Sequence, residues 1–514
     1  MRERKFTWLV WTVVLLAAFF RLYQLPQTPP GLYPDEAMNG NNAVEAWRTG
    51  EFKVYYPENN GREGLFINIQ ALFLAAIGQY EPWVLRLPAA IFGILTVLGL
   101  YFLGRELFSK RVGWLAAFFM ATSVWHIIFS RIGFRAVMAP LFLTWALFFF
   151  LRAMRESGER EAEGGAGTNS AFPNRFSLLA ALGGVFFGLG FYTYIAFRVM
   201  PLLFAVFLPF YFRRAEFWRT AIIFLGATIL VALPIGVYYL QNPADFLGRT
   251  SQISIFSSET PLRDLALNIG KTLAMFSFAG DYNWRHNLAG RPQLFWPVGL
   301  LLIWGVLTGI KRLGGRASAA FSAAGENNSE YENWESARNL KLSFALLFVW
   351  LGLAFLPVVI SAEGLPHALR AILMIPPVLL LAAAGAVSAY SAIRRHWRRL
   401  PLRPFVYAFL ILLVLEAYQT YFILWAKSPH TAGAFSADYV MIGRQINELA
   451  PATSKYVVVH AGGVAVRGLP MPTQTVMFLT DSFDPARLEE QNIHYIAPVE
   501  ADRLPENAIK FRLR

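Results

Sequence analysis

The sequence has 514 residues, of which 56% are hydrophobic, 16% aromatic and only 15% charged. Soluble domains carry about 25% charged residues, so this composition excludes an ordinary soluble protein and is typical of an integral membrane protein. The formal net charge is +13, but the Lys and Arg residues lie in short clusters between apolar runs, which favours a role in membrane topology over nucleic-acid binding. The absence of cysteine excludes disulfides and cysteine-based metal sites.

Apolar runs long enough to cross a bilayer recur along the chain. We therefore expect a polytopic α-helical membrane protein with about eleven transmembrane helices. The first run is expected to be an uncleaved span, since a clear signal-peptide cleavage site is missing. One further run, Leu65 to Gly78, is short and carries Asn68 and Gln70, so we expect an interfacial or re-entrant helix there. The predicted spans are residues 6–23, 83–103, 112–129, 136–151, 177–196, 198–212, 219–240, 294–310, 342–360, 368–390 and 405–425.

A cytoplasmic N-terminus places the basic clusters between these spans on the inner side, as the positive-inside rule requires. The clusters lie at residues 105–111, 152–160, 213–219, 311–316 and 394–399. This topology predicts a multi-pass protein of the plasma (inner) membrane with an extracytoplasmic C-terminus. The outer side then holds residues 24–82, residues 241–293 and the segment after residue 425.

The chain is expected to have two parts, a transmembrane domain over residues 1–425 and a small extracytoplasmic α/β domain over residues 426–514. In the second part, apolar residues from Tyr439 to Leu449 recur at helical spacing. Period and composition predict a further helix and three strands. The helix is expected over Asp484–Gln491, and the strands over Lys455–His460, Thr475–Leu479 and His494–Pro498.

The first outer loop contains the run Pro34-Asp35-Glu36. Proline is suited to the first position of a helix, which puts both carboxylates in the first turn. There they either complement the positive end of the helix dipole or supply a general base for an acceptor hydroxyl. Both interpretations stay open at this point.

His367 and Arg370 lie at the outer end of a predicted span whose helix should begin near Pro366. Because they are three residues apart, they share a helical face. Basic residues are disfavoured at a helix N-terminus unless an anion shares the site, so the pair predicts a phosphate site. The alternative is interfacial anchoring by Arg370 beside a hydrogen-bonded His367.

The second outer loop carries Asp281, Asn283, Trp284, Arg285 and His286. This mixture of an aromatic face with polar and charged side chains indicates either a sugar-binding surface or a loop that is polar for solubility.

The last predicted span contains a carboxylate, Glu416. An intramembrane carboxylate is a candidate for function, but a structural hydrogen bond to a neighbouring helix is the favoured interpretation.

The order of several short motifs along the chain resembles that of the GT-C membrane glycosyltransferases. The closest in appearance are the bacterial relatives of the protein O-mannosyltransferases and of the aminoarabinose transferase that modifies lipid A. The motifs are Pro34-Asp35-Glu36-Ala37, Arg62-Glu63-Gly64-Leu65, Arg86-Leu87-Pro88, Gly104 to Phe108, Ser130 to Arg135, Asp281 to Asn287 and Pro366-His367-Ala368-Leu369-Arg370.

This resemblance implies transfer of a hexose or pentose from a polyprenyl-phosphate carrier to an acceptor hydroxyl on the outer face of the membrane, with inversion at the anomeric carbon. The acceptor would be a glycan, a lipid or a protein. Asp35 matches the position of the family's catalytic acidic residue. Many relatives have a proline where this chain has Gly64, and Arg62 stands near the position of a lysine that is tied to the donor phosphate in some of them.

The expected site therefore divides into three groups of residues. Asp35 and Glu36 are expected to be catalytic. No metal or other cofactor is expected, because the sequence has no dense cluster of carboxylates or histidines at ligand spacing. The donor phosphate is assigned to His367, Arg370, Arg285, His286 and Arg62, and the sugar or acceptor to Asp281, Asn283, Trp284 and Glu63.

Two other functions stay open for the same residues. A lipid-phosphate transporter or flippase would use a basic outer mouth in the same way, without catalysis. A polymer ligase that uses lipid diphosphates would share the phosphate chemistry.

Overall fold

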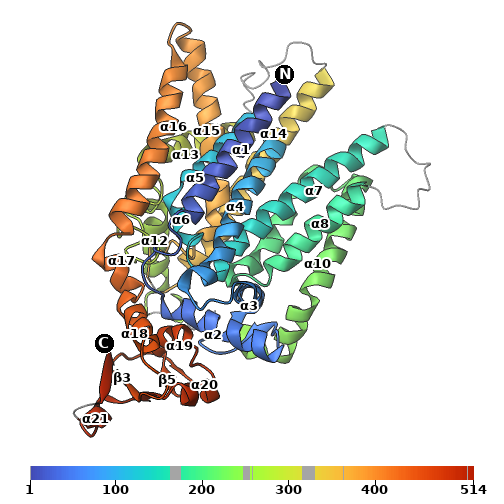
Figure 1. Ribbon diagram of the computed structural model, residues 1–514. Coiled ribbons are helices and arrows are strands. Elements are labelled where there is room, and N and C mark those ends of the chain that lie inside the picture. Colours follow the sequence, from blue (N-terminus) through green and yellow to red (C-terminus); the bar gives the residue numbers. More distant parts are fainter. Residues whose placement is uncertain are drawn as a thin grey trace.

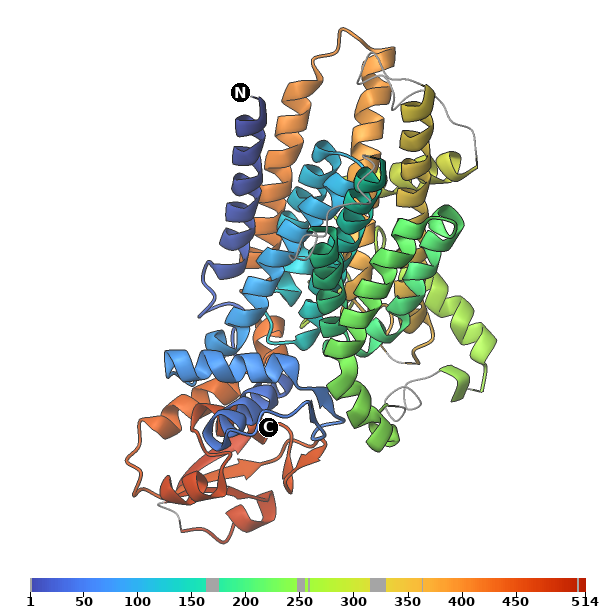
Figure 2. The same cartoon turned by 90° about the vertical axis from the view of Figure 1, so that its right-hand side faces the viewer.

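The computed structural model describes residues 2–162, 175–246, 255–257, 259–314, 330–362, 364–505 and 508–514; Arg316 of the fourth basic cluster lies outside them. Long helices run roughly side by side, and the two ends of the chain lie at opposite ends of this bundle (Figures 1 and 2). The long helices are α1 (Arg2–Leu22), α4 (Pro82–Leu107), α7 (Met138–Ala162), α10 (Ala215–Gln241), α13 (Trp296–Leu313), α14 (Glu330–Val359), α15 (Ile375–His396) and α16 (Leu402–Tyr418).

Shorter helical segments complete the bundle. They are α5 (Lys110–Thr122), α6 (Val124–Phe129), η1 (Arg135–Val137), α8 (Arg175–Gly190), η2 (Ile195–Phe207), α9 (Leu208–Tyr211), η3 (Ile255–Ser257), α12 (Pro261–Ala274), η5 (Ile372–Met374) and the π-helical η6 (Gln419–Trp425).

Within the described residues, seven helical segments are long and apolar enough to cross a membrane. Each of them coincides with a predicted span, which confirms the polytopic helical fold. The four other predicted spans correspond to α1, α5 with α6, α8, and η2 with α9, whose apolar stretches are shorter. The total of eleven therefore stays a prediction. The seven segments are Pro82–Leu107, Arg135–Gly158, Ala215–Gln241, Trp296–Leu313, Asn339–Val359, Ile372–His396 and Leu402–Trp425.

Glycines allow pairs of helices in the bundle to approach closely. A Cβ atom at Gly305 of α13 would lie 2.0 Å from the carbonyl oxygen of Leu381 in α15, and one at Gly385 of α15 would lie 2.1 Å from that of Leu301. Small residues at helix contacts are what association in lipid requires, because close van der Waals packing replaces the hydrophobic drive available in water.

The segment after α1 crosses the end of the bundle. It forms α2 (Pro34–Thr49), an antiparallel hairpin of β1 (Tyr55–Tyr56) and β2 (Arg62–Glu63), and α3 (Leu65–Ile77). Helices α2 and α3 run across the direction of the long helices (Figures 1 and 2). The helix predicted at Leu65–Gly78 is thus present; its position relative to a bilayer remains a prediction.

The C-terminal part lies at the end of the bundle where α2 and α3 lie, away from the N-terminus (Figure 1). It contains a parallel sheet with strand order β6-β3-β7 and a small antiparallel hairpin, β4 with β5. Its elements are α17 (Pro429–Ala434), α18 (Ala437–Asn447), β3 (Lys455–Val459), β4 (Ala465–Val466), β5 (Leu469–Pro470), α19 (Thr473–Leu479), α20 (Pro485–Glu490), β6 (Ile493–Ile496), α21 (Pro498–Ala501) and β7 (Ile509–Leu513).

The predicted strand at Thr475–Leu479 is wrong, because this segment is part of helix α19. All its residues are buried, and a short run that is buried on every side has no periodicity that separates strand from helix. The predicted strands at Lys455–His460 and His494–Pro498 and the predicted helices are present as β3, β6, α18 and α20. Strand β7 was not predicted.

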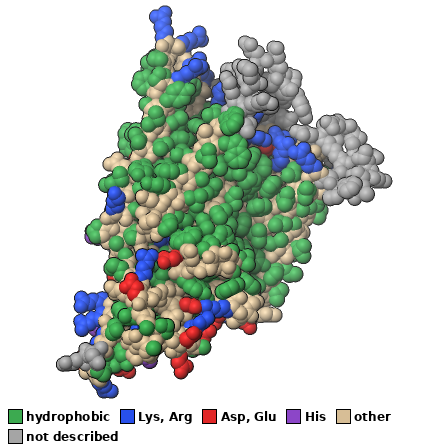
Figure 3. All heavy atoms as spheres, viewed as in Figure 1, with side chains coloured by type: hydrophobic (Ala, Val, Ile, Leu, Met, Phe, Trp, Pro, Cys, Tyr) green, Lys and Arg blue, Asp and Glu red, His purple; other side chains and the backbone are tan. Residues whose placement is uncertain are grey.

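Figure 3 shows how charge is distributed on one face of the molecule. Hydrophobic side chains cover most of the middle, Lys and Arg gather at the upper end, and both signs of charge gather at the lower end. An apolar belt between two polar ends is the arrangement expected of a protein that crosses a bilayer.

Candidate active site

Asp35 lies in the first turn of α2, as the proline before it predicted. Its Oδ1 atom accepts hydrogen bonds from Arg62 Nη2 and from Asn59 Nδ2, both at 2.6 Å. Pairing of Tyr56 with Arg62 in the β1–β2 hairpin delivers the arginine to this point. The Asp35 side chain is 35% exposed, whereas Arg62 is 7% exposed. The carboxylate is therefore oriented by its neighbours and still accessible.

Glu36, the next residue, is completely buried. Its two carboxylate oxygens accept hydrogen bonds from Arg86 at 2.9 and 3.0 Å, and Oε1 also accepts from the Gly133 backbone N–H at 2.7 Å. Arg86 also donates to the carbonyl oxygens of Pro29 and Gly31. Glu36 thus fixes the start of α2 to α4, and its position gives an acceptor hydroxyl no access. We keep Asp35 alone as the candidate base.

Tyr33 connects Asp35 to the second outer loop. The guanidinium carbon of Arg285 lies 4.0 Å from the centre of the Tyr33 ring. Burial and the negative charge of Asp35 raise the pKa of the Tyr33 hydroxyl, while Arg285 opposes this rise. Tyr33 therefore contacts Arg285 and interacts electrostatically with Asp35.

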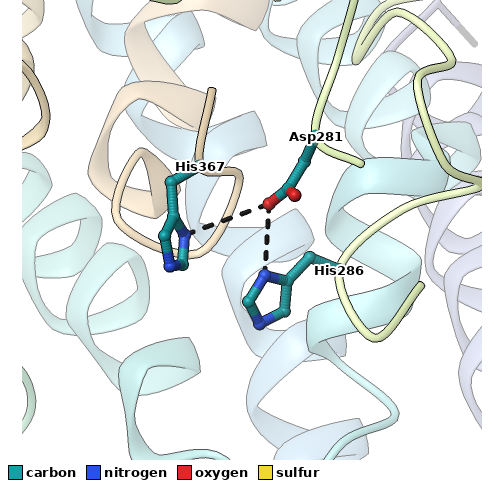
Figure 4. A group of neighbouring side chains, drawn as sticks. All are labelled: Asp281, His286 and His367. Carbon is teal, nitrogen blue, oxygen red and sulfur yellow. Dashed lines mark hydrogen bonds and ion pairs between the residues drawn. The ribbon is translucent and has the colours of Figure 1, made fainter. Parts of the chain in front are cut away.

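Asp281 joins this loop to the turn before α15 (Figure 4). Its Oδ2 atom accepts the Ala368 backbone N–H at 2.8 Å and lies 3.1 Å from His286 Nδ1 and 3.9 Å from His367 Nδ1. Its Oδ1 accepts the Asn283 N–H at 2.8 Å. With the side chain only 4% exposed, Asp281 acts as a clamp between two segments that are far apart in sequence.

Both histidines at this clamp are neutral near physiological pH. Burial lowers the pKa of His367 to about 3, and the charges of Arg370 and Arg285 add to this effect. Burial also lowers the pKa of His286, with the Asp281 carboxylate acting in the opposite direction. Burial alone would raise the pKa of Asp281, but its hydrogen bonds hold that pKa below the ordinary value. The positive charge beside the clamp therefore comes from the two arginines.

The remaining expected residues of the loop have structural contacts. Asn283 accepts the backbone N–H of Arg285 at 3.0 Å. The carbonyl oxygen of Trp284 accepts the indole N–H of Trp425 at 2.8 Å. The Trp284 ring stacks on the His430 ring with 5.0 Å between their centres. The loop is thus held against the segment that leads into the C-terminal part.

Glu63 lies in a separate cluster. It accepts a hydrogen bond from Arg135 Nε at 2.6 Å and lies 3.9 Å from Arg198, and it is 4% exposed. The structure thus pairs Glu63 with two arginines and leaves it almost no exposed surface.

Two other charged residues, one in the turn after α6 and one in α16, have structural partners. Arg131 is fully buried and donates to the Tyr421 hydroxyl and to the carbonyl oxygens of Phe20 and Thr28. Glu416 pairs with Arg291 and accepts the Thr420 hydroxyl. Both contacts are structural, but the predicted partner in a neighbouring helix is wrong, because Arg291 lies in the loop before α13 and Thr420 in η6, which continues α16.

The clamp brings together a possible metal-ligand set that the sequence did not reveal. The ligand atoms of Asp281, His286 and His367 lie within 4.8 Å of one another, and two neutral imidazoles with one carboxylate suit a zinc-like ion. The surrounding charge disfavours a metal ion, because the positive charges of Arg285 and Arg370 are close enough to lower the pKa of His367. An anion fits these surroundings better than a second cation.

Sequence reasoning missed two partners of Asp35. Asn59 lies in the β1–β2 turn, where Asn59, Asn60 and Gly61 all have positive φ. The Asn60-Gly61 pair between two short strands is a readable hairpin signal, but it does not show what Asn59 would contact. Tyr33 gave no signal beyond its place next to the Pro34-Asp35 pair.

Comparisons with known proteins agree with this architecture. Residues 65–164 match the family model described as dolichyl-phosphate-mannose-protein mannosyltransferase. The oligosaccharyltransferase AglB of Archaeoglobus fulgidus, solved with an inhibitory peptide and a dolichol-phosphate, has a TM-score of 0.52 at 13% identity, over 98% of this chain and 70% of that one. The apo form of the Archaeoglobus fulgidus oligosaccharyltransferase has a TM-score of 0.53 at 14% identity, over 96% and 65%.

ArnT from Cupriavidus metallidurans bound to undecaprenyl phosphate has a TM-score of 0.49 at 12% identity, over 98% of this chain and 92% of that one. No curated protein sequence matches this chain. The chain spans 65% to 70% of the length of the two archaeal structures. The family match and the archaeal structures together support a membrane glycosyltransferase, and the fold of this chain is that of the GT-C superfamily.

Proposed function

We propose that this protein transfers a sugar from a polyprenyl-phosphate donor to an acceptor hydroxyl at the outer face of the membrane, with inversion at the anomeric carbon. The observation that carries the proposal is the placement of Asp35. This carboxylate is accessible, is oriented by two donors, and is linked through Tyr33 to Arg285. A general base near basic side chains is what displacement of a lipid phosphate requires.

In the proposed reaction, the oxygen of the acceptor hydroxyl bonds to the anomeric carbon of the sugar. As this bond forms, Asp35 accepts the proton of the hydroxyl. The bond between that carbon and the donor phosphate oxygen breaks, and the polyprenyl phosphate leaves with the electron pair. Arg62 is paired with Asp35, so we assign it to orientation of the base and not to the phosphate. Attack opposite to the leaving oxygen gives inversion.

The leaving phosphate is assigned to Arg285 and Arg370, with His286 and His367 as neutral hydrogen-bonding groups. The charges of both arginines act on these histidines, so the four side chains share one region. Fixed cationic donors stabilise the charge that develops on a leaving phosphate. In the archaeal structure the same fold holds a dolichol-phosphate.

The scheme needs no metal, although Asp281, His286 and His367 are arranged as possible ligands. Transfer should therefore continue at the wild-type rate after dialysis against a chelator. A different result would assign these residues to a metal: the chelator abolishes turnover of the wild type, zinc or manganese restores it, and the remaining activity of His286→Ala does not respond to the chelator.

We propose that Asp35 and the C-terminal part lie outside the cytoplasm. Helix α2, which carries Asp35, and the C-terminal part lie at the end of the bundle that is opposite to the N-terminus and carries both signs of charge (Figures 1 and 3). A reporter fused after Ser428 should behave as exported; activity of the fusion only in the cytoplasm would reverse the topology.

The proposed function is tested with the purified full chain in lipid nanodiscs and a panel of polyprenyl-phosphate sugars. Loss of one donor in the presence of a hydroxyl acceptor, with an inverted linkage in the product, is expected. Binding of donors without any turnover would favour a lipid-phosphate transporter.

A further inference from the structure

The C-terminal part packs directly on the helix that carries Asp35. Helix α19 lies against α2, where Asn41 Nδ2 donates to Gln474 Oε1 at 2.9 Å, and the Thr475 hydroxyl donates to the Leu32 carbonyl at 3.0 Å. All three of these polar side chains are buried. A Cβ atom at Gly40 of α2 would lie 2.7 Å from the Phe478 ring. This contact is a packed interior that contains satisfied polar groups.

A second contact is made by Arg467, which lies in the turn between β4 and β5. Its guanidinium donates to both carboxylate oxygens of Glu45 at 2.8 and 2.9 Å and to Glu58 Oε1 at 2.9 Å, and it lies 4.2 Å from the centre of the Phe483 ring. A lone surface ion pair contributes little, but an arginine that bridges two carboxylates, with Nη2 on Glu45 and Nε on Glu58, and lies against an aromatic ring has a defined geometry.

Glu58 precedes Asn59, and Asn59 donates to Asp35 Oδ1 at 2.6 Å. The turn that holds both residues has positive φ at Asn59, Asn60 and Gly61. Asparagine tolerates this conformation, but the turn must be held in place for Asn59 to reach the carboxylate. Arg467 holds this turn in place, because its Nε donates to Glu58, the residue before Asn59.

We propose that the C-terminal part is a component of the catalytic site: Arg467, acting through Glu58 and Asn59, positions the Asp35 carboxylate for proton transfer. This inference rests on the proposed role of Asp35 as the base. Two donors on Oδ1 fix the direction in which the carboxylate faces, and removal of one of them lets it rotate. Arg467 and Asn59 are positioning residues, because neither is assigned to the substrate.

The same structure offers a matched control. Arg444 of α18 pairs with Glu81 at 2.9 Å, so it also ties the C-terminal part to the segment between α1 and α4. This ion pair does not involve the β1–β2 turn. Arg444→Ala thus removes an exposed ion pair between the same two parts of the chain and should leave turnover unchanged.

The test measures kcat, KM for the donor and the pH dependence of kcat in the full chain. Asn59→Ala should lower kcat by about 10- to 100-fold, the range for one hydrogen bond to a charged group, with little change in KM. Arg467→Ala should lower kcat in the same direction. In both variants the acid limb of the pH profile should move to higher pH, because the carboxylate has lost a donor.

A double variant separates positioning from general stabilisation. If Arg467 acts through Asn59, the Arg467→Ala/Asn59→Ala variant should match Asn59→Ala alone within about 2-fold. Multiplied losses would overturn the proposal, as would an Arg467→Ala enzyme that behaves like Arg444→Ala.

Hydrogen exchange of the backbone amides tests the connection without activity. Arg467→Ala, and not Arg444→Ala, should speed exchange over residues 58–63. Unchanged exchange there would overturn the connection even in an active enzyme, whereas faster exchange in a chain that transfers no sugar would reject the proposed function alone.

Discussion

The two aspartates of the candidate site are held in different ways. Asp35 has charged and amide donors on one oxygen and keeps 35% of its side chain exposed. Asp281 has backbone N–H donors on both oxygens, a histidine beside it and 4% exposure. An accessible carboxylate can exchange a proton with a substrate, whereas a buried one with several N–H partners joins segments of the chain. The comparison favours a chemical role for Asp35 and a structural role for Asp281.

The largest effect is expected for Asp35→Asn. The amide keeps the size and a polar oxygen but cannot accept the acceptor's proton, so turnover should fall by about 100- to 10,000-fold. Stability should hardly change, because a charge that complements a helix dipole is worth only about 0.3 to 1 kcal/mol. Turnover with radiolabelled donor and thermal unfolding measure the two quantities. Near-normal transfer by the folded variant would make Asp35 structural and leave the site without its base.

The same substitution at Asp281 should give the opposite result. Each carboxylate oxygen of Asp281 accepts a backbone N–H, whereas the amide of Asn has only one oxygen that can accept. The substitution therefore removes one charge-assisted hydrogen bond, which is worth about 1.5 to 3 kcal/mol. Asp281→Asn should therefore lower the thermal unfolding midpoint clearly, with Asp35→Asn as the matched comparison. A stable Asp281→Asn protein that has lost turnover would move Asp281 from architecture to chemistry.

Arg370→Ala should weaken donor binding by about 1.5 to 3 kcal/mol, the value of a hydrogen bond to a charged group. Arg263→Ala is the control, because Arg263 is an exposed arginine in α12 and is not assigned to the phosphate. Arg131 is unsuitable as a control, since it is fully buried. Donor affinity is read by titration in nanodiscs. Equal losses of donor affinity in the two variants would show that Arg370 acts only through the general positive charge of the surface.

Hydropathy predicted the bundle well, because a helix in lipid must satisfy its own backbone and therefore leaves a long apolar run in the sequence. The α/β part was harder. The period of a short buried run is ambiguous, so α19 was predicted as a strand. The site depends on contacts between distant segments, such as Ala368 with Asp281 and Arg86 with Glu36. No local pattern encodes those pairs.

The same limit explains why Asp35 and Glu36 could not be separated from sequence. They are neighbours in one helical turn, and both are acidic. Their difference arises from Arg86, whose side chain reaches Glu36 from α4, and from Asn59 and Arg62, which reach Asp35 from a hairpin. The pattern located the turn, and long-range contacts determined which carboxylate is accessible.

The smallest expected effect is a dependence of stability on pH at the Asp281 clamp. His367 has a pKa of about 3 in the folded protein, against 6.5 for an exposed histidine. Between these values the unfolded chain binds a proton that the folded chain does not, so stability is full above about pH 6.5 and falls as the pH is lowered toward 3. The slope is at most about 1.4 kcal/mol per pH unit for one histidine. Thermal unfolding between pH 7 and pH 5 measures it.

His367→Gln tests the origin of this slope, because glutamine keeps a polar side chain that does not titrate. The variant should lose less stability on acidification than the wild type. His494→Gln is the matched control, since His494 is an exposed histidine in β6, far from the clamp in sequence. If both variants keep the wild-type slope, the protons are taken up elsewhere, and the neutral histidine beside Asp281 has no part in the acid sensitivity. If only His367→Gln flattens it, His367 is the group whose protonation lowers the stability of the folded protein in acid.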